Sequence, residues 1–191
     1  IGLQLGTDQV CHTDILAGQV IDQSTHQGCL TCAGAAGDHD KAFAAADQVA
    51  VLGGRAVDVL ELMFPGRVFL DRYQYGTGDL PPVEEHGALL HALVRLGDAS
   101  LPIIERHLDD SSIETRFYAV FMLTRLNAEE LLPKLLDRLF DRDQQTRRIS
   151  GDIVLQYQSS AEFHLTVVDR LHRELASGEE LHATVSAGLL A

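Results

Sequence analysis

Three cysteines are the residues with the most obvious chemistry in this chain of 191 residues. Cys29 and Cys32 form a Cys-x-x-Cys pair, and Cys11 with His12 lies upstream. Because thiolate and imidazole groups are the usual ligands of tetrahedral zinc, these residues could hold one ion. A zinc site usually has two regularly spaced ligand pairs, and here only one is present. Three reduced thiols in an irregular segment would therefore give the same pattern. We therefore expect no metal and no cofactor, and Cys11, Cys29 and Cys32 remain the alternative zinc ligands.

Nine histidines are scattered along the chain and provide a second possible set of metal ligands. The dipeptide Glu85-His86, with His91 five residues further on, is the nearest approach to a ligand pattern. Side chains share a helix face at spacings of three and four residues, not five. We expect the histidines to be exposed or hydrogen-bonded at helix surfaces.

A long loop and an arginine-rich turn could bind a partner without doing chemistry. Residues 65–82 contain three glycines and three prolines, which are typical of a loop. The same segment contains the aromatic residues Phe69, Tyr73 and Tyr75. Aromatic side chains on loops are frequent binding anchors, so we take Tyr73 and Tyr75 as candidate binding residues. In the alternative interpretation, Phe69 and one tyrosine hold the loop against the rest of the protein.

The charge distribution limits the class of partner. The chain has 28 acidic and 15 basic residues, a net charge of -13, which disfavours sequence-independent binding to nucleic acid. Residues 111–148 are the exception, with seven bases against six acids. Arg142, Arg147 and Arg148 lie at one turn of this region and could contact an acidic peptide or a phosphate. We therefore add Arg142 and Arg148 to the candidate binding residues.

The elements that position these residues follow a repeat. The segment that starts at Leu101 matches the segment that starts at Leu132, with an offset of 31 residues. Similar or identical residues recur in register: Pro102 and Pro133, Ile104 and Leu135, Leu108 and Leu139, Asp110 and Asp141, Thr115 and Thr146, Arg116 and Arg147. Residues 52–57 resemble residues 96–101 and suggest a weaker upstream copy. Such self-similarity is typical of stacked repeat proteins.

Each repeat reads as two helices. Apolar residues at 101, 103, 104 and 108 form a helical stripe, Asp109 to Ser112 supply a turn and an N-cap, and a second apolar stripe follows from Ile113. The predicted helices span 41–52, 54–64, 83–96, 99–109, 112–126, 128–140, 143–157, 160–176 and 179–190.

The unit resembles the short bacterial HEAT-like repeat, the type found in phycobilisome-lyase-like proteins, best over residues 96–157. The features that carry the resemblance are Leu-Pro in the first helix, an Asp-rich turn, and Thr115-Arg116 or Thr146-Arg147 entering the second helix. The resemblance implies a right-handed, all-α solenoid of about four helical hairpins over residues 41–191, with the loop 65–82 inserted. It also implies a ladder in which Asp110, Arg116, Asp141 and Arg147 link neighbouring units.

Residues 1–40 lie outside the repeat and contain five acids and no lysine or arginine. We expect an irregular, acidic lead-in there, or a cap over the first helices. The sparse, odd set of cysteines is typical of the reducing cytoplasm, and no apolar run approaches the length of a membrane span.

For a stacked solenoid of this kind, we expect a non-catalytic interaction or scaffold module of the HEAT-repeat type. Its partner would be a protein or peptide bound along the second helix of each pair. The alternative is an enzyme or chaperone on the same scaffold, similar to a chromophore lyase or a DNA glycosylase.

Overall fold

The computed structural model describes residues 39–52, 55, 57–75, 80–161 and 163–190. Regular structure in these residues is entirely helical, and strands are absent from them. The α-helices are α2 (His39–Val51), α3 (Val57–Met63), α4 (Ala88–Leu96), α5 (Leu101–His107), α6 (Ile113–Met122), α7 (Leu132–Arg138), α8 (Gln144–Gln156), α9 (Asp169–Leu175) and α10 (Glu180–Leu190). Residues 1–38 of the lead-in expected over residues 1–40, and with them the three cysteines, lie outside the described residues, whereas His39 and Asp40 belong to α2.

The two central helix pairs repeat the 31-residue spacing that the sequence predicts. The helix α5 begins at Leu101 and α7 at Leu132, and α6 begins at Ile113 and α8 at Gln144. The N-cap residues are equally spaced, because the Ser112 and Asp143 side chains accept hydrogen bonds from the backbone N–H groups of Thr115 and Thr146. The same local sequence therefore produces the same hairpin twice.

The first helices are shorter at their N-termini than the sequence predicts. Short 3₁₀ segments, η4 (Gly97–Ser100) and η5 (Glu129–Leu131), precede α5 and α7. Pro102 and Pro133 then lie in the first α-helical turn, where a backbone N–H has no partner within the helix. Proline is therefore tolerated at both positions without a kink.

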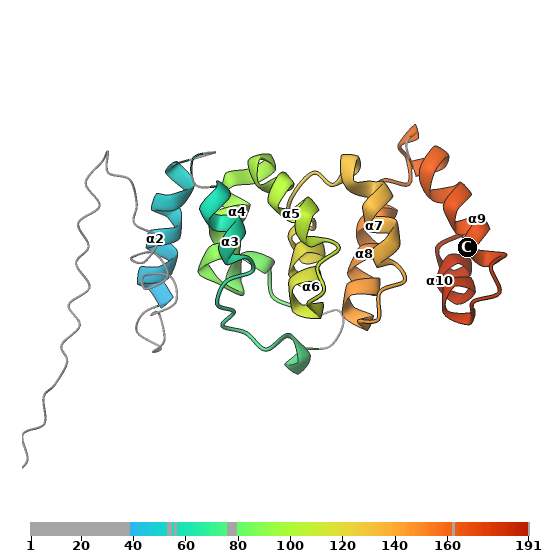
Figure 1. Cartoon of the computed structure of the whole chain (residues 1–191), viewed down its shortest axis with the longest axis horizontal. Helices are drawn as coiled ribbons and strands as arrows, with labels where there is room; N and C mark the ends of the chain where they lie inside the picture. Colours follow the sequence, from blue (N-terminus) through green and yellow to red (C-terminus); the bar gives the residue numbers. More distant parts are fainter. Residues whose placement is uncertain (1–38, 53–54, 56, 76–79, 162, 191) are drawn as a thin grey trace, which may run out of the picture.

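The helices lie in a row along the longest axis of the molecule, as Figure 1 shows. The pairs α3/α4, α5/α6, α7/α8 and α9/α10 follow one another in chain order, with α2 beside α4 at one end. Buried leucine, isoleucine and aromatic side chains form a core that runs from Leu60 to Leu171. Because each pair has apolar side chains on more than one side, neighbouring pairs bury surface that a single pair would expose.

The ends of the row differ from its centre. At one end, Ala42 and Ala46 of α2 pack on Ala88 and Ala92 of α4, and these small residues allow a close approach of the two helices. At the other end, the predicted helix 160–176 is divided, because residues Phe163–Val168 (η6) are π-helical and α9 follows. In the part of the chain described here, no helix is both long enough and apolar enough to cross a membrane.

Candidate binding surface: a loop held by Arg72

The inserted loop leaves α3 through a turn that only glycine adopts easily. Gly66 has a φ of +76°, and Phe69 N–H then donates to the carbonyl oxygen of His86 at 2.8 Å. A Cβ atom at Gly87 would lie 2.6 Å from the carbonyl oxygen of Arg67, so this position requires glycine as well. The loop is therefore held against the start of α4 before it crosses to the next helix pairs.

The loop next forms a single 3₁₀ turn, η2 (Arg72–Gln74), which carries Arg72 into the protein. The Asp71 carboxylate caps this turn, since it accepts from the backbone N–H of Tyr73 at 3.1 Å and from the Gln74 side chain at 3.3 Å. The Arg72 side chain is 0 % exposed. A fully buried arginine is rare and requires partners for its charge.

Three polar side chains from the N-terminal ends of α6 and α8 surround the Arg72 guanidinium. Its Nε donates to Glu114 at 3.0 Å, and its Nη1 donates to Asp143 at 2.9 Å and to Gln145 at 2.8 Å. The Gln145 amide in turn donates to the backbone carbonyl of Arg72 at 3.1 Å. The side chain and the backbone of Arg72 are thus both bound, and the loop joins two helix pairs.

Two aromatic rings complete the environment of Arg72. The guanidinium carbon lies 4.1 Å from the centre of the Phe117 ring and 4.3 Å from the centre of the Tyr73 ring. Its Nη2 also donates to the Tyr73 hydroxyl. Burial disfavours the charged guanidinium, but the hydrogen bonds and charges of Asp143 and Glu114 outweigh it and raise the pKa of Arg72.

This arrangement presents Tyr73 at the surface. Tyr73 is 66 % exposed although its hydroxyl and ring both contact Arg72, whereas Tyr75 is half-buried. Phe69 packs on the cluster between α2 and α4, as the alternative interpretation of the loop predicts. The residue that joins the loop to α6 and α8, however, is Arg72, which the sequence interpretation overlooked. Its position between Asp71 and Tyr73 reads as an ordinary polar loop.

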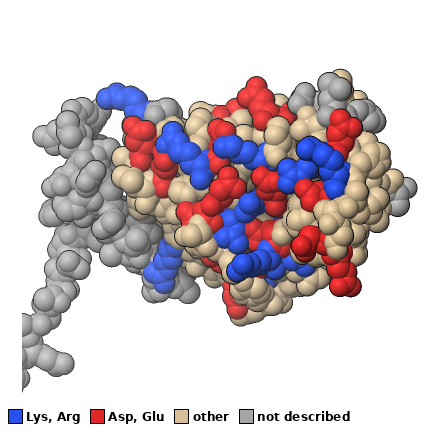
Figure 2. Space-filling view, turned by 45° about the vertical axis from the view of Figure 1, so that its right-hand side comes forward, with Lys and Arg blue, Asp and Glu red and all other residues tan. Residues whose placement is uncertain are grey.

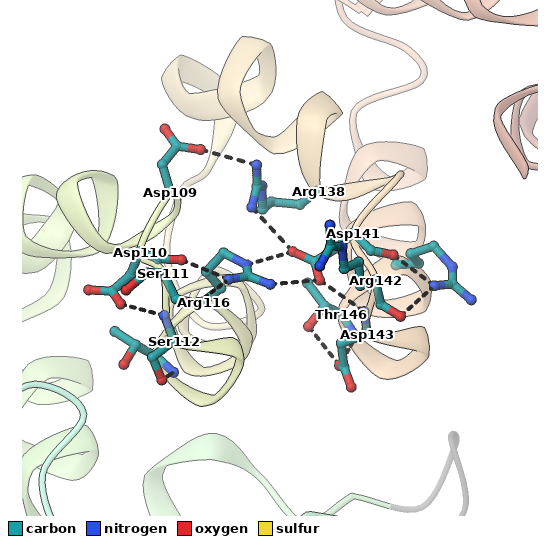
Figure 3. Close-up of polar contacts among 12 residues, drawn as sticks. Asp109, Asp110, Ser111, Ser112, Arg116, Arg138, Asp141, Arg142, Asp143 and Thr146 are labelled. Atoms are coloured by element: carbon teal, nitrogen blue, oxygen red, sulfur yellow. Dashed lines mark hydrogen bonds and ion pairs between the residues drawn. The ribbon is translucent and has the colours of Figure 1, made fainter. Parts of the chain in front are cut away.

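The contact that the sequence predicts between Arg116 and Asp141 is present, as Figure 3 shows. Arg116 Nε and Nη2 donate to the two carboxylate oxygens of Asp141 at 2.7 and 3.2 Å. Arg116 Nη1 donates to the carbonyl oxygens of Asp110 and Ser111 at 2.8 and 3.0 Å. The Arg116 side chain is 12 % exposed and that of Asp141 is 2 % exposed. The pair therefore links α6 to the turn before α8 with a two-pronged, mostly buried ion pair.

A second arginine extends this network to the first helices. Arg138 contacts Asp109 at 3.2 Å and Asp141 at 3.2 Å, so Asp141 is shared by two guanidinium groups (Figure 3). The Asp141 carboxylate also accepts from the backbone N–H of Asp143 at 2.9 Å. Burial alone would raise the pKa of Asp141, but these hydrogen bonds and charges, that from Arg116 foremost, lower it.

The remaining predicted arginines lie at the turn before α8 and in its first two turns. Arg142 and Arg148 are exposed. Arg147 is half-buried, and its Nη1 donates to the carbonyl oxygens of Asp141 and Arg142 at 2.7 and 3.0 Å. Arg72 brings the loop to this same turn, because its guanidinium binds Asp143. Of the two predicted ladder arginines, Arg147 is the one without a carboxylate partner among the described residues.

The expectation that every histidine lies at a surface is wrong for His86, which is 0 % exposed. Its Nδ1 lies 3.1 Å from the Tyr118 hydroxyl and its Nε2 lies 3.1 Å from the carbonyl oxygen of Pro81. Burial lowers the pKa of His86, so the neutral ring donates from Nε2 and accepts at Nδ1. Two adjacent glutamates give the segment a polar appearance in the sequence, which hides this burial.

The carboxylates of Asp141 and Asp143 make stability depend on pH. Burial alone would raise the pKa of Asp143, but the hydrogen bonds from Arg72 and Thr146 and the charge of Arg72 lower it. The pKa of Asp141 is lowered in the same way. A pKa lowered in the folded state adds stability that is complete above the unfolded value of about 3.9 and is lost as pH falls through the folded value. We expect the melting temperature to fall between about pH 5 and pH 2. Asp141→Asn should flatten this fall in calorimetry, and an unchanged slope would contradict the assignment.

Within the described residues, no group of three or more histidine, cysteine, aspartate or glutamate side chains is placed to hold a metal ion. The alternative zinc ligands Cys11, Cys29 and Cys32 lie outside those residues, so the structure neither supports nor opposes that alternative. No known family model matches the chain, and no curated protein and no solved structure shows a significant match to it.

Proposed function

We propose that the chain is a non-catalytic partner-binding module built as a HEAT-like α-solenoid, with Tyr73 as the central contact for another protein. Three features support the solenoid: the 31-residue spacing of α5–α8, the linear order of the helix pairs, and the Arg116–Asp141 link between units. Adjacent helix pairs held in register form a long surface on which a protein or peptide can lie. The composition of the chain favours action in the cytoplasm.

The observation that carries this proposal is the combination of exposure and fixation at Tyr73. Binding hot spots are enriched in tyrosine and arginine, and a side chain that is ordered before binding loses less entropy on association. Tyr73 is 66 % exposed, and Arg72 holds both its ring and its hydroxyl. An exposed ring on an unrestrained loop would have no such advantage.

From the sequence, we expect the partner to lie along the second helices, but part of that surface is covered in the structure. The N-terminal ends of α6 and α8 are already occupied by Arg72 and the backbone of η2. Ile113, at the start of α6, remains 45 % exposed. We therefore centre the proposed binding surface on Tyr73 of the loop and not on the bare helices.

Affinity capture from the native cell extract tests the proposal, with the full chain as bait and quantitative mass spectrometry as the readout. Tyr73→Ala should reduce capture of a specific partner by at least about tenfold, the effect typical of a binding hot spot. Tyr73→Phe keeps the ring and should retain most of the capture. Leu62→Ala is the matched control, since Leu62 is 79 % exposed but belongs to α3. Equal capture by wild type and Tyr73→Ala would contradict the proposal.

A further inference from the structure

We propose that Arg147 is an open position of the arginine–aspartate ladder and binds an acidic side chain of a partner peptide. This inference rests on the proposed function as a binding module and names the chemistry of a second contact, away from Tyr73. Its evidence is a comparison of equivalent positions in successive helix pairs.

Arg116 and Arg147 are anchored in the same way. In each, Nη1 donates to two consecutive backbone carbonyls of the preceding turn, those of Asp110 and Ser111 or those of Asp141 and Arg142. Both backbone N–H groups also bond to the carbonyl of the N-cap residue, four positions earlier. The two guanidinium groups are thus fixed to their own turns through the same atom.

The two arginines differ at the other edge of the guanidinium. In Arg116 the Nε and Nη2 atoms hold both oxygens of Asp141. In Arg147 the same two atoms have no hydrogen-bond partner among the described residues. Neither atom is buried, because the buried, unpartnered side-chain polar atoms of those residues belong to His107, Arg138, Ser150 and Ser186. One edge of a fixed guanidinium fork is therefore open to a ligand.

The following helix pair shows why the chain leaves this edge open. In the turns before α6 and α8, the carboxylates of Asp110 and Asp141 accept from the backbone N–H two residues later. In the turn before α10, the Ser177 hydroxyl accepts from the N–H of Glu179 in the same manner. Ser177 thus occupies the same position relative to its helix start as the ladder aspartates, and it supplies no charge. Three residues before the helix start, the third turn carries a hydroxyl where the others carry an acid.

The charge around Arg147 favours an acidic occupant. Arg142 and Arg148 are exposed on either side of it in the sequence, within the region whose bases outnumber its acids. On the face shown in Figure 2, blue lysine and arginine side chains are interspersed with red aspartate and glutamate side chains. The ladder itself shows the preferred ligand, because Arg116 binds an aspartate at a helix-start turn with two parallel hydrogen bonds.

The test uses a synthetic peptide that copies residues 139–146, the turn whose Asp141 is bound by Arg116. Its binding to the ¹⁵N-labelled full chain is followed by NMR at the Arg147 Nε–H resonance. We expect saturable binding that is at least about tenfold weaker for a control peptide with both aspartates replaced by asparagine. Arg147→Lys keeps the charge but loses the fork, and should also weaken binding by about tenfold. Arg125→Ala, which removes a distant surface arginine, should leave binding unchanged.

Several results would overturn this inference. Equal affinity for both peptides, or unchanged binding to Arg147→Lys, would show that the open edge does not recognise carboxylates. If inorganic phosphate shifts the same resonance at lower concentration than the peptide does, Arg147 binds phosphate groups. If the wild-type chain sediments as a dimer and Arg147→Lys sediments as a monomer, Arg147 binds a second copy of the chain. If the wild-type chain does not bind the peptide but still captures a partner through Tyr73, this inference is wrong and the proposed function is unaffected.

Discussion

Replacing Arg72 with alanine will lower the free energy of unfolding by about 3 to 5 kcal/mol. The change leaves Asp143, Glu114 and Gln145 without the guanidinium that they surround, and it removes the side chain that lies against the Phe117 ring. An uncompensated buried carboxylate costs more than the ion pair contributes, so the loss exceeds that of an ordinary surface pair. Urea unfolding, monitored by circular dichroism, measures the difference in the free energy of unfolding between this variant and the wild type.

The matched control for this prediction is Arg125→Ala. Arg125 also pairs with a glutamate, Glu84, at 2.9 Å, but its side chain is 42 % exposed. Exposed pairs contribute about 0 to 1 kcal/mol, so this variant should unfold close to wild type. Similar losses in the two variants would mean that Arg72 does not join the helix pairs in solution.

Replacing Asp141 with alanine is expected to cost about 3 kcal/mol. Its carboxylate is the shared acceptor for Arg116, Arg138 and the backbone N–H of Asp143, and the turn loses all of these bonds together. Arg116→Ala should cost about 1 to 4 kcal/mol, because Asp141 keeps its other donors. Thermal unfolding by calorimetry measures both effects.

A double-mutant cycle separates the pair from its surroundings. If Arg116 and Asp141 act as one unit, the double variant should cost less than the sum of the single variants by more than about 1 kcal/mol. Lys134→Ala is the control, because Lys134 bonds to Glu105 in a pair that is nearly half exposed on both sides. Strictly additive losses at Arg116 and Asp141 would contradict a ladder role for the pair.

The sequence predicts the central helix pairs well because the signals for them are local. Apolar spacing, a capping residue and a proline recur at an interval of 31 residues, and α5–α8 repeat that interval. The helices α6 and α8 begin one residue after their predicted starts, whereas α5 and α7 begin two and four residues after theirs. The Arg116–Asp141 contact is predictable for the same reason, since a repeat brings equivalent turns side by side. The divided helix at 163–175 and the 3₁₀ starts of α5 and α7 differ from the predicted helices, because apolar spacing does not distinguish α-helical from 3₁₀ or π-helical turns.

The candidate site is mostly invisible in the sequence because its contacts are distant. Arg72 lies 71 residues from Asp143 and 73 residues from Gln145, and no local pattern connects them. The aromatic content of the loop correctly draws attention to Tyr73, yet it does not reveal which neighbouring residue holds the ring in place. His86 was missed for a related reason, since its partner Tyr118 lies 32 residues away.

Hydrogen–deuterium exchange of the loop tests whether Arg72 fixes the loop and so presents Tyr73. The amide of Tyr73 donates to Asp71, and that of Tyr75 donates to the Arg72 carbonyl. We predict slow exchange at these amides in the wild-type chain. We predict fast exchange in Arg72→Met, while the amides of α6 and α8 stay protected. Fast exchange of the loop in the wild-type chain, or equal protection in the variant, would show that Arg72 does not fix the loop.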